Sequence, residues 1–276
     1  MLWWINPRYE AALAPRGGNS YDAFARLRPA DALVEKTGRS TARYLIDLAG
    51  EPVGIYLKKY SGLSWWTRNW TCESNFPGPR EWGNIQRVQE MGIRTAEPIV
   101  VAADRKHACQ SLLATRELKG YEELHIFIRR RLAGEMSQET WELKQRIIER
   151  LADTARTLHQ ARLYHQDFYL CHFFIREDQS QPCGFDLILI DLLRLAHSWR
   201  SRWQVKDLAQ LLFSSDLAGI QPEDRLRFFK RYLGVDRLTG AARRLRMRVE
   251  WKAWLYHRHN KKLEDRVRRE ALGYAV

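Results

Sequence analysis

Residues 165–172 read His-Gln-Asp-Phe-Tyr-Leu-Cys-His, and this loop decides which fold and chemistry the sequence predicts. Ahead of it, Gln138–Gln160 carries apolar residues at helical spacing. Asp191 stands nineteen residues after His172, at the end of the apolar run 187–190. Phosphoryl transfer needs one carboxylate to accept the proton of the attacking hydroxyl and another to hold magnesium against the phosphates. Asp167 is therefore the candidate catalytic base, and Asp191 is a candidate metal ligand.

The catalytic loop of protein kinases follows the pattern H-R-D-x-x-x-x-N, whose final Asn binds a second magnesium ion. His165 and Asp167 match this pattern, whereas Gln166 replaces the Arg and His172 stands at the Asn position. The residues after Asp191 are Leu-Leu instead of Phe-Gly. These differences argue against an ordinary protein kinase. A chance H-x-D match in a surface loop is the competing interpretation, which the preceding helix and the following strand disfavour.

A kinase site also needs a strand lysine for the phosphates and a glutamate that positions it. In the strand predicted over 53–60, alternation places aliphatic side chains on one face and Lys58 on the other. Lys59 would then extend its charge past the end of the strand. The next predicted helix, 80–91, carries Glu81 in its first turn. We expect Lys58 and Glu81 to bind the nucleotide together, with a solvated surface pair as the alternative.

The sequence contains only a weak match to the glycine-rich loop that covers the phosphates in kinases. Residues 36–40 offer one glycine, Gly38, where kinases have G-x-G-x-x-G. Arg39 or backbone amides could compensate for the missing glycines. Glu117, near the end of the strand predicted over 111–118, is grouped with Gly38 among the expected cofactor-binding residues.

The chain changes character near residues 118–120. The preceding part is rich in predicted strands, although residues 1–30 read as irregular, and the following part is mostly helical. The sequence therefore predicts an α+β, bilobal, protein-kinase-like fold. A small β-rich N-terminal lobe would cover residues 1–118, and a larger, mostly helical C-terminal lobe would cover residues 119–276.

The longer catalytic-loop pattern resembles that of the lipopolysaccharide kinases of the Kdo/WaaP type, especially the core heptose kinases. Their loop looks like H-R-D-x-Y-x-C-H-F-L, and this chain matches it at Asp167, Tyr169, Cys171, His172 and Phe173. His at the position of His172 is usual in that family, so the departure from protein kinases becomes a match.

Further segments between Gly38 and Leu233 agree with the resemblance. They are Tyr56-Leu57-Lys58, Arg80-Glu81-Trp82, Ile190-Asp191-Leu192, Lys206-Asp207-Leu208 and Phe213-Ser214-Ser215. Two positions depart from the family pattern, with Gln166 for Arg and Leu193 for His. The chain therefore resembles a divergent member whose acceptor could differ.

The resemblance implies an ATP- and Mg²⁺-dependent kinase that phosphorylates a sugar hydroxyl, heptose before others, of the lipopolysaccharide inner core at the cytoplasmic face of the inner membrane. A kinase of Kdo, another small molecule or a protein is the alternative. His172 is a second candidate metal residue, but it could instead bond to Asp167 or pack, because imidazole is not a preferred magnesium ligand.

The formal net charge of +13 favours anionic partners. A basic nucleic-acid-binding protein would leave Asp167, Asp191, Lys58 and Glu81 without a role, so we expect no nucleic acid partner. No apolar run approaches the ~18 residues that span a bilayer. We therefore expect a cytoplasmic protein, peripheral to an anionic membrane surface.

Two segments combine tryptophan with cations. Residues 64–70 could cover the small lobe, touch a membrane interface or stack on sugars. The C-terminal stretch reads as a basic helix, solvated or membrane-facing, on which Trp251, Trp254 and Leu255 could anchor one face.

Overall fold

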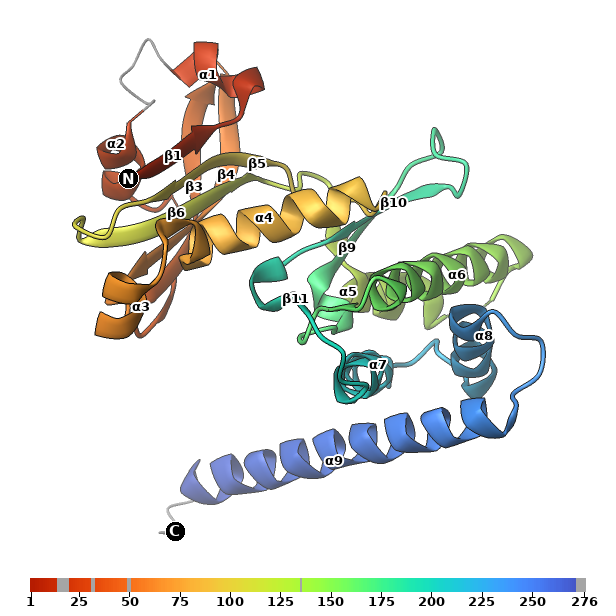
Figure 1. The fold of residues 1–276 in the computed structure, drawn as a ribbon. Helices are drawn as coiled ribbons and strands as arrows, with labels where there is room; N and C mark the ends of the chain where they lie inside the picture. Colours follow the sequence, from red (N-terminus) through yellow and green to blue (C-terminus); the bar gives the residue numbers. More distant parts are fainter. Residues whose placement is uncertain (14–19, 31–32, 49–50, 135, 272–276) are drawn as a thin grey trace. The chain divides into compact units, whose positions relative to one another are not determined.

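An antiparallel six-stranded sheet, in the order β1-β5-β6-β4-β3-β2, dominates the first part of the chain (Figure 1). This computed structural model describes residues 1–13, 20–30, 33–48, 51–134 and 136–271. The strands are β1 (Leu2–Ile5), β2 (Leu33–Lys36), β3 (Arg39–Leu48), β4 (Glu51–Ser61), β5 (Pro98–Ala103) and β6 (Cys109–Arg116). Gly38 turns β2 into β3 with a φ of 74°, and its carbonyl accepts the Ser61 N–H. An added Cβ would lie 2.6 Å from the Ser61 carbonyl oxygen, so this position requires glycine.

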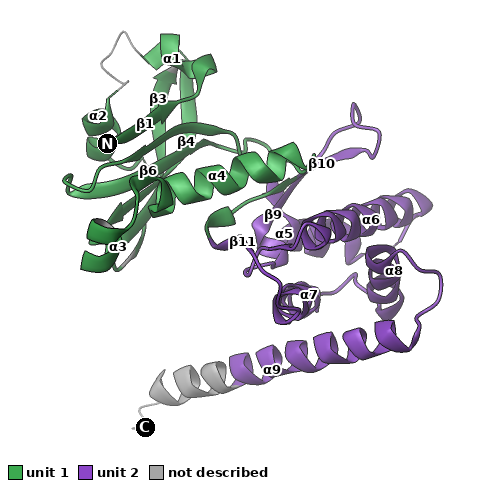
Figure 2. Cartoon of the chain, viewed as in Figure 1, with its two compact units in different colours: residues 1–120, 188–193 green, residues 121–187, 194–276 purple. Residues whose placement is uncertain are grey.

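The chain divides into two compact units (Figure 2). The first comprises Met1–Gly120 and Ile188–Leu193, and the second comprises Tyr121–Leu187 and Arg194–Val276. Residues 188–193 thus belong with the first unit, although the sequence-based lobe 119–276 includes them. The mixed α/β architecture, with a sheet first and helices later, confirms the predicted fold class.

Two short helices, α1 (Pro7–Leu13) and α2 (Tyr21–Arg26), complete the core of the first unit. Tyr9, Tyr21 and Phe24 are buried against fully enclosed residues of β4 to β6. The interpretation of the N-terminal segment as irregular is therefore wrong for residues 2–13 and 21–26, and residues 14–19 lie outside the described residues. Elements this short are marginal in isolation, and here pairing of β1 with β5 and tertiary burial stabilise them.

The helices α3 (Trp65–Trp70) and α4 (Pro77–Glu90), separated by η2 (Glu73–Asn75), follow β4. The three tryptophans of α3 have exposed side chains, so the interpretation in which they cover the small lobe is wrong. Helix α4 begins with proline at its first turn and packs on β5 and β6 through Ile85 and Val88. This packing brings Glu81 to the sheet.

The second unit is mostly helical. Its helices are α5 (Leu124–Phe127), η3 (Ile128–Leu132), α6 (Gln138–Gln160), η4 (Leu170–His172), α7 (Arg202–Ser214), α8 (Pro222–Leu233) and α9 (Gly240–Ala271). The short helix η5 (Leu192–Arg194) crosses the division between the units. The small strands are β7 (Glu122–Glu123), β8 (Leu163–Tyr164), β9 (Phe173–Glu177), β10 (Phe185–Leu189) and β11 (Ala196–His197). Helix α8 packs on α6, and α9 packs on α7.

The side chain of Lys144 on α6 forms a buried ion pair with Asp224 on α8, with 2.9 Å between Nζ and Oδ2. Separating the two helices at this point would leave a buried charge uncompensated. The pair therefore favours the observed contact between α6 and α8. Among the helices in the described ranges, none has the length and apolar character to cross a membrane.

Two glycines of α4 test how the helix lies on the sheet. A Cβ at Gly78 would lie 2.5 Å from the Leu112 carbonyl oxygen, whereas one at Gly83 would meet no described atom within 4 Å. We expect Gly78→Ala to lower the free energy of unfolding by about 1–3 kcal/mol through overpacking. Gly83→Ala should raise it by about 0.5–1 kcal/mol through helix propensity. Urea unfolding measures both, and equal effects would contradict this packing.

Candidate active site

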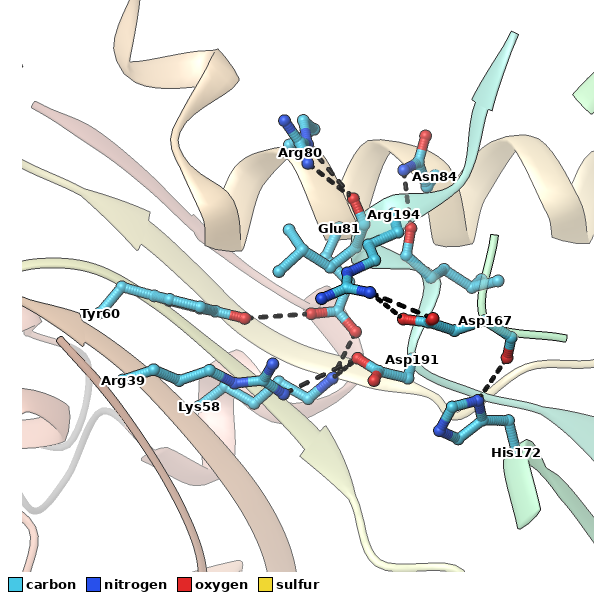
Figure 3. Close-up of polar contacts among 12 residues, drawn as sticks. Arg39, Lys58, Tyr60, Arg80, Glu81, Asn84, Asp167, His172, Asp191 and Arg194 are labelled. Atoms are coloured by element: carbon cyan, nitrogen blue, oxygen red, sulfur yellow. Dashed lines mark hydrogen bonds and ion pairs between the residues drawn. The ribbon is translucent and has the colours of Figure 1, made fainter. Parts of the chain in front are cut away.

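In the first unit, the ammonium group of Lys58 on β4 lies between two carboxylates (Figure 3). Its Nζ is 2.5 Å from Oε1 of Glu81 on α4 and 3.0 Å from Oδ1 of Asp191. The Glu81 side chain is 3% exposed and that of Lys58 is 15% exposed. Three residues that the sequence singled out for phosphate and metal binding are therefore in direct contact.

The pleat of β4 explains why Lys58, and not its neighbour, occupies this position. Ile55 and Leu57 are fully buried on the core face. Lys59 lies on that same face, where Nζ donates to the carbonyls of Ala25 at 2.8 Å and Leu27 at 3.0 Å. As the alternation predicts, the two lysines thus lie on opposite faces, and Lys59 is bound to backbone carbonyls away from Glu81.

Burial disfavours the charge on Lys58, but Glu81 and Asp191 outweigh it and raise the pKa of Lys58 above its usual value. Tyr60 donates a hydrogen bond to Oε2 of Glu81 at 3.4 Å. Burial, reinforced by the Glu81 carboxylate, raises the pKa of Tyr60 so that the phenol keeps its proton. The Glu81 carboxylate therefore accepts from two donors, and Lys58 stays cationic.

Asp191 has an unusual backbone conformation, with a φ of 58° in the left-handed region. Such a conformation is costly in a non-glycine residue and persists only where its surroundings impose it. Here α4 does so: Asn84 donates to the Leu192 carbonyl at 2.8 Å, and Arg80 donates to the Leu193 carbonyl at 3.0 Å. Helix α4 therefore positions both Glu81 and the segment that carries Asp191.

The sequence did not reveal this role of Arg80 and Asn84. Their spacing of four residues on one helix face, on either side of Glu81, is the signal that could have revealed it. Arg39, which the sequence offered as a substitute for a glycine-rich loop, reaches the same cluster, with Nη2 3.7 Å from Oδ1 of Asp191.

In the second unit, side chains of α7 hold the catalytic loop. Asp207 is fully buried, and its two carboxylate oxygens accept the N–H groups of His165 and Gln166, both at 2.8 Å. Gln210 accepts the Phe168 N–H at 2.9 Å. Ser214 likewise accepts the backbone N–H of residue 170. These three α7 residues are three and four positions apart, which puts their side chains on one helix face.

The carboxylate of Asp167 binds Arg194 of the same unit. Nη1 of Arg194 is 3.1 Å from Oδ1 and 2.9 Å from Oδ2 (Figure 3). The backbone carbonyl of Asp167 contacts Nδ1 of His172 at 2.6 Å. The His172 ring also stacks on His165, with centroids 5.8 Å apart. His172 thus orders the loop around Asp167, which was one of the roles that the sequence left open.

The model of one protein family, described as "Lipopolysaccharide kinase (Kdo/WaaP) family", matches residues 28–232. The chain belongs to this family. The family match extends over both the Lys58–Glu81 segment and the catalytic loop, so it confirms the resemblance drawn from the sequence and identifies the protein as a phosphotransferase of the lipopolysaccharide kinase type.

Individual relatives agree with the family assignment. The chain is 31% identical, over 72% of its length and 75% of the relative's, to lipopolysaccharide core heptose(I) kinase WaaP of Pseudomonas aeruginosa. It is 28% identical to the protein of the same name from Escherichia coli K12, over 78% of this chain and 82% of that one. A solved structure titled "WaaP in complex with acyl carrier protein" is similar over 96% of this chain and 99% of that one, at 25% identity and a TM-score of 0.65.

Gly38 and Glu117, the remaining residues expected to bind the nucleotide, lie outside the Lys58 cluster. Gly38 forms the β2–β3 turn. The Glu117 carboxylate binds the Arg43 guanidinium, with Nε 2.6 Å from Oε1. It also lies over Gly54, where a Cβ would overlap it. The carboxylate of Glu117 is therefore committed to Arg43, and its role toward a nucleotide stays a prediction.

The donor set fits a magnesium ion bound chiefly through substrate phosphates. Among the described residues, no cluster of three or more His, Cys, Asp or Glu side chains could hold a metal alone. Magnesium is usually bound by one or two carboxylates together with phosphate oxygens. Asp191 offers such a carboxylate, whereas His172 offers the less suitable imidazole.

The two lysines of β4 allow a test of the nucleotide assignment. Lys58→Ala removes the cation held by Glu81 and Asp191, so we expect turnover to fall at least about tenfold, with weaker nucleotide binding. Lys59→Ala should leave turnover nearly unchanged and lower thermal stability, because its ammonium group binds two backbone carbonyls and lies over the Tyr44 ring. Steady-state phosphoryl transfer and melting curves separate the two effects. A larger loss of turnover at Lys59 would contradict the assignment.

Asp207 provides a test of how the loop is held. Asp207→Asn puts an NH₂ group against one of the backbone N–H donors and leaves that donor unpaired, at a cost of about 1–3 kcal/mol. We expect lower stability in urea and reduced turnover, because Asp167 follows the two bound amides. Asp216→Asn, at a carboxylate that is 63% exposed, serves as the control and should change neither. Wild-type stability in Asp207→Asn would refute this role.

Proposed function

We propose that the protein phosphorylates a heptose hydroxyl of the lipopolysaccharide inner core, with ATP as the phosphate donor and magnesium as the metal. The contact of Lys58 with Glu81 and Asp191 carries this proposal, since phosphate positioning requires such a cluster. The names of the relatives support heptose as the acceptor sugar, because the chain covers 75% and 82% of the length of two core heptose(I) kinases.

Each residue has a distinct part in the proposed reaction. Asp167 accepts the proton of the sugar hydroxyl while the hydroxyl oxygen forms its bond to the γ-phosphorus. The bond from that phosphorus to the bridging oxygen breaks, and ADP leaves. Lys58 neutralises phosphate charge, and Glu81 keeps its ammonium in place. Asp191 would hold magnesium, which supplies charge neutralisation on the phosphate oxygens when bound.

Arg194 has a positioning part in this scheme. Its contact with both oxygens of Asp167 fixes the direction of the carboxylate. Gln166 stands where related loops have Arg. The cation next to Asp167 is therefore Arg194, from the segment after Asp191, and not a residue of the loop itself.

A different acceptor, such as Kdo, is the second candidate. The departures at Gln166 and Leu193 favour it, because both positions adjoin proposed reacting groups in the sequence. Core oligosaccharide structure distinguishes the two sugars directly.

The acceptor carries a lipid, so we propose that the protein works at the cytoplasmic face of the inner membrane as a peripheral protein. The net charge of +13 supports contact with anionic lipid. We also propose acyl carrier protein as a protein partner, because the solved relative that holds it is similar along nearly this whole chain.

The decisive experiment combines a deletion strain with mass spectrometry of its core oligosaccharide. We expect the deletion to lack one phosphate on heptose, and the wild-type gene to restore it. Asp167→Ala should not restore it, and in vitro its turnover should fall by about 10²–10⁴ while its melting curve stays normal. Asp178→Ala, a loop carboxylate of the same unit, is the control.

Near-normal turnover of Asp167→Ala would refute the catalytic assignment. An unchanged heptose, with phosphate missing from another sugar, would replace the heptose proposal by the second candidate.

A further inference from the structure

Helix α9 is held to the second unit by one narrow face. Ala242, Val249 and Ala253 are buried, and their spacing of seven and four residues keeps them on one side of the helix, which packs on α7. The ring of His257 also contacts Phe213 of α7, with centroids 4.6 Å apart. These contacts fix which side of α9 points away from the unit.

Outside this packed face, the helix carries three large apolar side chains that are more than half exposed. Met247 is 67% exposed, Trp251 is 62% exposed and Trp254 is 51% exposed. Positions 247, 251 and 254 follow the i, i+4, i+7 spacing of a single helix stripe. Trp251 and Trp254, two of the residues that could anchor one face of the helix, are therefore exposed. Exposed apolar side chains gathered in one patch mark an interaction surface.

Cations are interleaved with this stripe. Arg244, Arg248 and Arg258 lie on the same side of the helix by the 100° turn per residue, and all three are exposed. The Arg258 guanidinium lies 5.5 Å from the Trp254 ring centroid. Glu250 is the one acidic residue from Gly240 to Lys261, and it pairs with Arg246. The outer face is therefore apolar and positive at once.

We infer that this outer face of α9, defined by Arg244, Met247, Arg248, Trp251, Trp254 and Arg258, lies in the interface of an anionic bilayer. Indole rings prefer the headgroup level of a membrane, where their apolar body is buried and their N–H stays hydrated. Arginines on the same stripe meet the lipid phosphates. A helix with tryptophan and arginine on one exposed side has the composition of an in-plane interfacial helix.

This inference rests on the proposed function, since a lipid-borne acceptor is what brings the enzyme to a membrane. It goes further by assigning the contact to one face of one helix. The two kinds of side chain also predict two components of binding: the arginine component weakens with salt, because the screening length is ~8 Å near physiological ionic strength. The tryptophan component does not depend on salt.

The test is cosedimentation of the full-length protein with phosphatidylcholine vesicles that contain or lack phosphatidylglycerol. We expect wild-type protein to bind the anionic vesicles, with a blue shift of tryptophan fluorescence. The Arg244→Gln, Arg248→Gln, Arg258→Gln variant should bind about 10²-fold more weakly at low salt. The Trp251→Ala, Trp254→Ala variant should bind about tenfold more weakly and lose the shift.

A Trp65→Ala, Trp66→Ala variant is the matched control, since it removes two exposed tryptophans from α3 of the other unit. It should bind vesicles as the wild type does. All three variants change surface side chains outside the proposed site, so their melting curves and their activity on a delipidated soluble acceptor should be normal. That activity separates the outcomes, because its absence in the wild type would refute the proposed function and not the membrane contact.

Three results would overturn the inference. The first is an absence of wild-type binding to anionic vesicles at low salt. The second is equal weakening by the α3 control and by the α9 tryptophan variant. The third is unchanged vesicle binding of the α9 tryptophan variant together with lost binding of acyl carrier protein or of nucleic acid, which would assign the face to that partner.

Discussion

A buried ammonium group loses its hydration, and at Lys58 two carboxylates compensate for the loss. This requirement joins three separate parts of the chain: β4 supplies the cation, α4 supplies Glu81, and residues 188–193 supply Asp191. Each carboxylate would repel the other without the lysine. The ion cluster therefore fixes the positions of these three side chains relative to one another.

Helix α4 makes more contacts that position this cluster than a single ion pair, because it supplies Glu81 and also binds the segment that carries Asp191. One face of the helix packs on the sheet, while Arg80 and Asn84 bind backbone carbonyls next to Asp191. The left-handed backbone of Asp191 is thus imposed from outside its own segment. Gly78 allows α4 to approach β6 closely, so the position of Glu81 depends on a residue that carries no chemistry itself.

The second unit prepares its catalytic loop by another device. There a buried carboxylate holds the backbone: Asp207 accepts two consecutive amide N–H groups ahead of Asp167 and also contacts the His159 ring. A carboxylate that accepts two N–H groups is well satisfied although it is fully buried. The Asp167 side chain pairs instead with Arg194, which is exposed. In α9 of the same unit, buried small residues on one side leave tryptophan and arginine on the other.

The sequence by itself determined the family and the fold class, because motif spacing and the order of strand-rich and helical segments are local properties. The roles that it assigns to Asp167, Lys58, Glu81 and Asp191 stay predictions. It also separated Lys58 from Lys59 by parity. Only the tertiary structure decided which helices hold the loop and Asp191, that the described residues of the N-terminal segment form β1, α1 and α2, and that the tryptophans of α9 are exposed. These outcomes depend on contacts between residues that are far apart in the sequence. A helix with apolar residues on two sides has a pattern that does not predict which side is buried.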